Sequence, residues 1–226
     1  KSLAAFLGCP ISLDFDTGWI DPIWTGDDMD CQSLALDDQN PYFQYTIAEQ
    51  VRSVEEAKGK SIPVISGAFG GCGDTLAWIR GSERLLYDVM DRPDQVREAD
   101  QYLMDLWIQV YDRFHNLTRE VTGGSTTWFP LWSSGKMYST QNDFAYMISP
   151  KQFQDIFLPT IEKQLQYLDH SIHHLDGEGN FAHLDALCEL PNLNAIQVLP
   201  GAGKPSPLHY MPILKRVLRG FPCFAP

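Results

Sequence analysis

A histidine and an aspartate two residues apart, His174 and Asp176, are the side chains whose types and spacing most clearly suggest chemistry. The apolar residues around them predict a β-strand over 172–175. Residues two apart in a strand point to the same face, and Glu178 and His183 follow closely. Imidazole and carboxylate groups bind zinc and similar cations. The segment therefore predicts a metal site of His174, Asp176 and Glu178, with plain hydrogen bonding at a strand end as the alternative.

A glycine-rich segment at 67–74, GAFGGCGD, superficially resembles a phosphate-binding loop. It has no lysine at the position that a P-loop needs and no GxGxxG spacing. We expect these glycines to let the backbone turn sharply and a helix to begin at Asp74. An anion bound at the start of that helix remains an open alternative.

Aromatic and polar side chains follow the predicted strands and are candidates for binding a substrate. Aromatic walls suit an apolar, planar or sugar-like small molecule, and packing inside the fold is the alternative for each ring. The candidate substrate-binding residues are Trp19, Trp24, Phe69, Trp128, Trp132, Tyr138 and Gln197.

Short strand-like runs alternate with helical patterns, which is typical of repeated βα units around a parallel sheet. Strands are expected over 11–14, 62–66, 126–131, 172–175, 195–198 and 222–225. Apolar periodicity predicts a long helix from Pro93 to Gly123, a second beginning at Ser149-Pro150 and a third over about 207–220. Five or six units are fewer than a closed barrel needs. We expect one domain over 1–226, a (β/α)₈ TIM barrel lacking terminal units, with a doubly wound sheet as the alternative.

The composition restricts the partners that the chain can have. The formal net charge of −12 argues against nucleic acid, which binds through Lys and Arg, and against anionic membranes. No apolar run approaches the length needed to cross a bilayer. The five cysteines form no CxxC pair. These features predict a cytoplasmic protein with reduced thiols and a small-molecule substrate.

Several segments together resemble the uroporphyrinogen decarboxylase-like superfamily, which includes corrinoid-dependent methyltransferases. They carry the SGAF, DTLAWIRG, LLYD and RPDQV sequences, followed by QND and ISP. They lie at 66–69, 74–81, 85–88, 92–96, 141–143 and 148–150, and the resemblance extends over about 62–203. It implies an enzyme on a (β/α)₈ barrel.

The resemblance implies two kinds of chemistry. The methyltransferases of the superfamily typically hold zinc with a His-x-Cys pair and a later cysteine, and the metal activates a thiol. Here Asp176 stands where the first cysteine is expected, and Cys72 is a possible replacement for the later one. The decarboxylases need cations for substrate carboxylates and an acidic residue near the pyrrole nitrogens. Arg80 and Lys136 are the candidate cations, and Asp143 fits the acidic role.

The leading hypothesis is metal-assisted methyl transfer between a small methylated substrate and a corrinoid or thiol carrier. Asp143, Asp176 and Glu178 are the candidate catalytic carboxylates, zinc is the expected metal, and a partner protein is expected to carry the corrinoid. A cofactor-independent decarboxylase is the first alternative. A carbohydrate-active barrel with Asp143 and Glu178 as paired acids, or a ligand-binding barrel, is the second. The resemblance also allows a homodimer.

Overall fold

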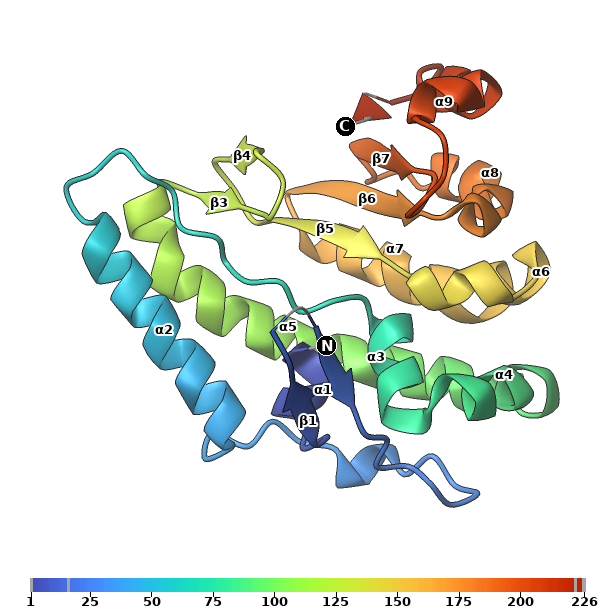
Figure 1. The fold of residues 1–226 in the computed structure, drawn as a ribbon, viewed down its shortest axis with the longest axis horizontal. Helices are drawn as coiled ribbons and strands as arrows, with labels where there is room; N and C mark the ends of the chain where they lie inside the picture. The colour runs from blue at the N-terminus through green and yellow to red at the C-terminus, as the bar shows by residue number, and fades with distance from the viewer. Residues whose placement is uncertain (1, 16, 222, 225–226) are drawn as a thin grey trace.

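The computed structural model describes residues 2–15, 17–221 and 223–224 of this mixed α/β chain (Figure 1). The N-terminal part contains α1 (Ser2–Phe6), β1 (Ile11–Leu13), β2 (Gly18–Ile20), the 3₁₀ helix η1 (Cys31–Ser33), α2 (Pro41–Ala57), α3 (Cys72–Arg80), α4 (Ser82–Asp91) and α5 (Pro93–Thr122). Next come β3 (Ser125–Thr126), β4 (Trp132–Ser133), β5 (Met137–Gln141), the 3₁₀ helix η2 (Asp143–Met147), α6 (Pro150–Gln152), the π-helical turn η3 (Phe153–Phe157) and α7 (Leu158–Tyr167). The remaining elements are β6 (His170–Asp176), the 3₁₀ helix η4 (Glu178–His183), α8 (Leu184–Cys188), β7 (Ala195–Leu199), the 3₁₀ helix η5 (Pro207–Tyr210), α9 (Met211–Val217) and β8 (Cys223–Phe224).

Four parallel strands form one open sheet in the order β5-β6-β7-β8. The strands expected over 172–175 and 195–198 are confirmed as β6 and β7. In the pairing register, Gln141, His174 and Gln197 lie side by side on three neighbouring strands. The expected α/β class is confirmed, and the strands do not close into a barrel within the described residues.

Of the four other strand predictions, the one for 62–66 was wrong and the rest were right only in part. Residues 11–14 supply β1 of a local antiparallel hairpin with β2, because the chain turns back at once. Residues 62–66 form no strand, and one backbone bond joins Ser66 N–H to the Thr126 carbonyl at 3.5 Å. Only the first residue of the strand expected over 126–131 is in a strand, the short antiparallel β3. The strand expected over 222–225 appears as β8, while Pro222 and Ala225 lie outside the described residues.

Helix α5 runs through the whole molecule (Figure 1). It joins an N-terminal part, which includes α2, α3 and α4, to a C-terminal part, which includes η3, α7 and β3. It begins at Pro93 and ends before Gly123, whose backbone is left-handed at φ 66°, as the sequence predicts. The expected apolar stripe is confirmed, because Val96, Leu103 and Phe114 are fully buried. No helix among the described residues is long and apolar enough to cross a membrane.

The helix expected at Ser149-Pro150 is confirmed and contains a π-helical turn. Ser149 and Gln152 form a reciprocal capping box at its start. Pro159 has no N–H to donate to the carbonyl of Asp155 four residues earlier, and Arg97 of α5 donates to that carbonyl at 3.2 Å. The Arg97 bond at this interruption therefore connects α5 to this helix.

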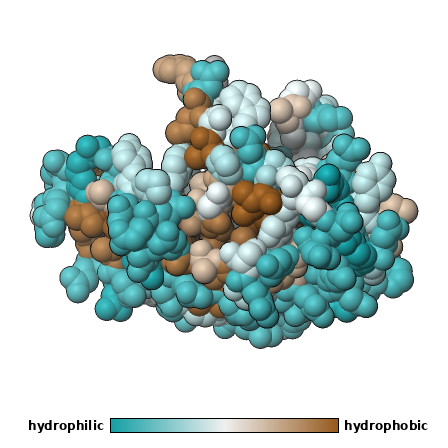
Figure 2. Space-filling model, turned by 90° about the horizontal axis from the view of Figure 1, so that it is seen from below, coloured by the Kyte–Doolittle hydropathy of each residue, from teal (hydrophilic) through white to brown (hydrophobic). Residues whose placement is uncertain are grey.

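Figure 2 shows apolar surface near the middle of the face seen from below, bordered by hydrophilic side chains.

Candidate active site

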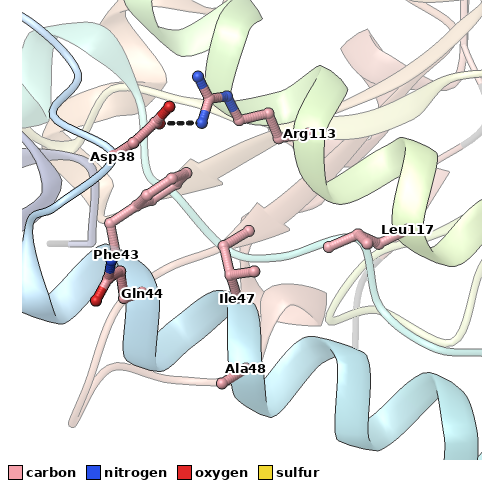
Figure 3. A pocket seen from close by; sticks show the side chains of 7 residues that line it. All are labelled: Asp38, Phe43, Gln44, Ile47, Ala48, Arg113 and Leu117. Atoms are coloured by element: carbon pink, nitrogen blue, oxygen red, sulfur yellow. Dashed lines mark hydrogen bonds and ion pairs between the residues drawn. The ribbon is translucent and has the colours of Figure 1, made fainter.

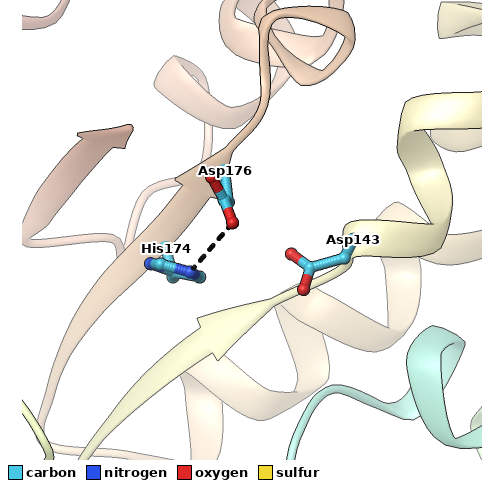
Figure 4. Close-up of side chains that lie close together, drawn as sticks. All are labelled: Asp143, His174 and Asp176. Carbon is cyan, nitrogen blue, oxygen red and sulfur yellow. Dashed lines mark ion pairs between the residues drawn. The ribbon is translucent and has the colours of Figure 1, made fainter. Parts of the chain in front are cut away.

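Three side chains that could bind a cation meet at the carboxyl ends of the parallel strands. Asp143, His174 and Asp176 each offer one ligand atom, and these atoms all lie within 4.8 Å of one another (Figure 4). His174 Nε2 is 3.9 Å from the Asp176 carboxylate. His174 and Asp176 share a face of β6, as their spacing predicts, and Asp143 comes from the segment after β5.

Hydrogen bonds from two directions hold the segment that carries Asp143. Asn142 accepts a bond from the Ala145 N–H at 3.1 Å and caps η2 at its start. Asp74 on α3 accepts from the Phe144 N–H at 2.9 Å and from Gln141 Nε2 at 3.1 Å. The prediction that α3 begins at Asp74 was wrong, because Gly71 is the cap residue and Cys72 begins the helix. Asp74 instead connects α3 to the segment that carries the site.

The His174 ring is held on several sides. Its Nδ1 lies 2.5 Å from Gln197 Oε1 on the neighbouring strand β7. The Trp128 ring meets it edge-on with centroids 6.4 Å apart, and the Phe129 ring is tilted at 5.8 Å. These contacts leave Nε2 as the ring atom that faces the two aspartates (Figure 4).

The electrostatics of the site favour a positive charge. Desolvation of the Asp143 carboxyl group, together with the nearby charges of Asp74 and Asp176, raises its pKa to about 7. Burial also raises the pKa of Asp74. Carboxylates that are crowded together hold protons at neutral pH, and a bound cation would replace those protons. Asp143 can therefore act as a proton donor or as a cation ligand.

A cavity of about 250 Å³ adjoins Asp143 between α3 and η2. Its wall combines two carboxylates with aromatic, thioether and small side chains. The lining residues are Asp74, Ala77, Trp78, Ser82, Asp143, Phe144 and Met147. None of these lining residues carries a positive charge, so the cavity suits a small neutral or cationic molecule better than an anion.

Glu178, expected as a metal ligand and catalytic acid, is not part of the group of three. Its carboxylate pairs with Lys204 at 2.6 Å and accepts a hydrogen bond from the Tyr210 hydroxyl. The chain leaves the strand at Gly177, whose φ of 88° ends the alternation of side chains. The two-residue spacing that works for Asp176 therefore does not extend to Glu178.

Three of the aromatic residues expected to bind substrate are instead buried in the hydrophobic core, namely Trp24, Phe69 and Tyr138. The Tyr138 hydroxyl accepts hydrogen bonds from the backbone N–H groups of Phe69 and Gly70 at 2.6 and 3.1 Å. Trp24 Nε1 donates to the Ser33 hydroxyl at 3.4 Å. These contacts give the three rings structural roles.

The other candidate tryptophans are divided among different parts of the molecule. Trp128 contacts His174 and stays near the site. Trp19 is exposed on β2, outside the parallel sheet. Trp132 is exposed beside His170 at the amino ends of the parallel strands and donates to the Thr122 carbonyl at 3.0 Å. Of these three, only Trp128 is placed to meet a ligand of His174.

Cys72 was considered as a replacement metal ligand, and Arg80 and Lys136 as cations that bind substrate carboxylates. All three side chains contact other residues of the protein instead. Cys72 is buried against Met104, with sulfur atoms 3.8 Å apart, and burial raises its pKa well above the usual value. Arg80 pairs with Asp88 inside the N-terminal part. Lys136 pairs with Asp112 at 2.9 Å and precedes β5, at the opposite end of the sheet.

A larger cavity of about 450 Å³ lies between α2 and α5, away from these groups (Figure 3). It is mainly apolar, and its two charged side chains, Asp38 and Arg113, form an ion pair with each other. The lining residues are Asp38, Phe43, Gln44, Ile47, Ala48, Arg113 and Leu117. It shares no residue with the site at the strand ends.

No protein-family model and no curated protein matches this chain. Among solved structures, the fold is similar to that of a methyltransferase from Methanosarcina mazei, with a TM-score of 0.64 and 14% sequence identity. The similarity covers 87% of this chain and 54% of that protein, so the chain spans about half of the other's length. It supports the fold without singling out the uroporphyrinogen decarboxylase branch. The chain therefore has an α/β fold similar to that of this solved structure.

Proposed function

We propose that this chain belongs to an enzyme that transfers a methyl group between a small methylated substrate and a corrinoid or thiol carrier. The observation that carries the proposal is the group formed by Asp143, His174 and Asp176, at the strand ends of a fold similar to that of a methyltransferase. Active sites of parallel α/β folds gather at this end of the sheet.

The three donors fit a divalent cation such as zinc. Ligand atoms about 2.0–2.2 Å from a tetrahedral ion lie roughly 3.4 Å apart, and His174 Nε2 is 3.9 Å from the Asp176 carboxylate. A side-chain shift of about half an ångström brings that pair to the ligand spacing, and the atoms of Asp143, which lie within 4.8 Å of the other two, have to move by no more than about 1.4 Å. One nitrogen and two oxygen donors make a harder site than the thiolate sites typical of thiol activation. When bound, the ion would act as a Lewis acid at the carrier or substrate.

The remaining residues of the site would bind and orient the substrate. The cavity beside Asp143 would hold the methylated molecule, with Trp78 and Phe144 as apolar walls and the carboxyl group of Asp74 as a nearby polar group. A methylated ammonium or sulfonium group fits this combination of carboxylate and aromatic groups. Asp143 would accept or release a proton when it is not holding the cation, because its pKa is about 7.

Metal content measured together with turnover tests the proposal. Purified protein is loaded with Zn²⁺, dialysed and analysed for zinc, and methyl transfer is followed with methylcobalamin and 2-mercaptoethanol. We expect about one zinc per chain in the wild type. In His174→Ala we expect a loss of tenfold to a hundredfold or more in zinc affinity and in transfer, because even groups behind a metal ligand have effects of this size.

His170→Ala is the matched control, since His170 lies on the same strand but bonds Ser133 at the amino end. We expect this variant to keep both zinc and activity. Zinc affinity in His174→Ala equal to that of the wild type would contradict the proposal, as would transfer that a chelator leaves unchanged.

A second function, cofactor-independent decarboxylation, is favoured by one observation. A carboxyl group with a pKa of about 7, that of Asp143, can deliver a proton to a developing charge at neutral pH. The two cations expected to bind substrate carboxylates, Arg80 and Lys136, are held in ion pairs elsewhere. Carbon dioxide release that persists in a chelator and disappears in Asp143→Asn would support decarboxylation over methyl transfer.

A further inference from the structure

The nearest polar neighbour of the His174 ring is a buried amide. Gln197 is 3% exposed, lies directly beside His174 in the β6–β7 register, and points its Oε1 at Nδ1 from 2.5 Å. With the amide oxygen facing the ring, as in this structure, the oxygen accepts and Nδ1 carries the hydrogen of this bond. A neutral imidazole has one N–H, and Nε2 is then left with a free lone pair.

That lone pair faces the side where the cation ligands converge. Nε2 lies 3.9 Å from Asp176 Oδ2, and Asp143 completes the group (Figure 4). The Trp128 and Phe129 rings pack around the imidazole and restrict its rotation. The opposite tautomer would direct the Nε2–H at the two aspartates and leave the only nitrogen lone pair on Nδ1, which faces Gln197 and not the cation ligands.

We propose that Gln197 is a positioning residue, which fixes the Nδ1–H tautomer of His174 and so makes Nε2 available as a metal ligand. The proposal rests on the metal site of the proposed function, but the tautomer itself exists without any metal. Gln197 thus acts through His174, where the sequence suggested direct contact with substrate.

The neighbour on the other side of His174 cannot take this role. Gln141 is also in register with His174, but its Nε2 donates to Asp74 at 3.1 Å. His173 points to the opposite face of β6, where Thr140 lies 2.9 Å from its Nδ1. Among the hydrogen bonds of the described residues, the one to Gln197 is the bond that sets the His174 ring.

Nitrogen-15 NMR of the histidine rings in metal-free protein at pH 8 tests the tautomer directly. We expect wild-type His174 to show a protonated Nδ1 and an unprotonated Nε2. Gln197→Met removes the acceptor at similar size, and we expect it to mix the tautomers and weaken Zn²⁺ binding by about tenfold to a hundredfold. Gln197→Glu restores an acceptor, and we expect zinc affinity within a few-fold of the wild type or tighter.

Gln164→Met is the matched control, because Gln164 is also 3% exposed but lies on α7. We expect it to leave the His174 spectrum and zinc affinity unchanged. A wild-type ring protonated at Nε2 would overturn the proposal without any variant. Equal zinc affinities in Gln197→Met and the wild type would also overturn it. If the wild type binds no zinc, the proposed function fails, while the NMR result still decides whether Gln197 sets the tautomer.

Discussion

Replacing Arg80 with methionine should destabilise the protein rather than weaken substrate binding. Arg80 and Asp88 are 2% and 4% exposed at the side chain, and Arg80 Nε lies 2.6 Å from the Asp88 carboxylate. Arg80 also donates to the Trp24 carbonyl at 2.9 Å and to that of Gly26, so it fixes the segment before α2. The variant leaves the buried Asp88 carboxylate and the buried Trp24 carbonyl short of a donor.

The size of the destabilisation can be worked out from the removal of one partner of a buried ion pair. Such losses are about 3–5 kcal/mol, and Arg92, which also bonds Asp88, remains and moderates the effect. We therefore expect a decrease of about 3 kcal/mol in the free energy of unfolding. For a chain of this size it corresponds to a fall of roughly 6–12 °C in Tm.

Urea denaturation followed by circular dichroism measures the change. Lys163→Met is the control, because the exposed Lys163–Asp105 pair should contribute no more than about 1 kcal/mol. The double variant Arg80→Met/Asp88→Leu should recover part of the stability, since it removes the unpaired charge. A loss below about 1 kcal/mol in Arg80→Met would refute the reasoning and make Arg80 available again as a substrate-binding cation.

Three further variants test other parts of the structure by urea denaturation. Burial raises the pKa of Asp100 from 3.8 to about 8, so the folded state holds a proton that the unfolded state releases, and wild-type stability falls as pH rises from about 4 to 8. Asp100→Asn should flatten that decline, and equal slopes would contradict it. Tyr138→Phe leaves two buried N–H groups without their acceptor and should lose about 1–3 kcal/mol, whereas an unchanged midpoint would argue against those bonds. Ser149→Ala removes the capping box with Gln152 and should lose about 1 kcal/mol, and no loss would show that the cap is not formed.

The sequence predicted the elements that have a strong apolar period and clear ends. Helix α5, between Pro93 and Gly123, and strands β6 and β7 are of this kind. Strand β5 was missed because its sequence, MYSTQ, contains no apolar run. It is a strand because it pairs with β6. The local pattern of apolar residues does not predict which distant segments pair as strands.

In the candidate site too, local spacing predicted some of the arrangement, and pairing between strands determines the rest. The spacing of His174 and Asp176 was enough to place both on one face of β6. Asp143 was expected as a catalytic acid, but its place beside His174 depends on β5, which the sequence did not predict. The role of Gln197 depends on the β6–β7 register, which no single strand reveals.

The length of α5 has a consequence for how the chain folds. At about 1.5 Å per residue, its 30 residues extend for roughly 45 Å. Along that length it contacts α2, α3 and α4 on the N-terminal side and η3, α7 and β3 on the C-terminal side. Neither group of elements can lose its contacts with α5 without exposing buried apolar residues of α5, the helix on which the other group also packs. The two parts should therefore melt in a single cooperative transition, and a chain cut within α5 should leave both fragments without a stable core.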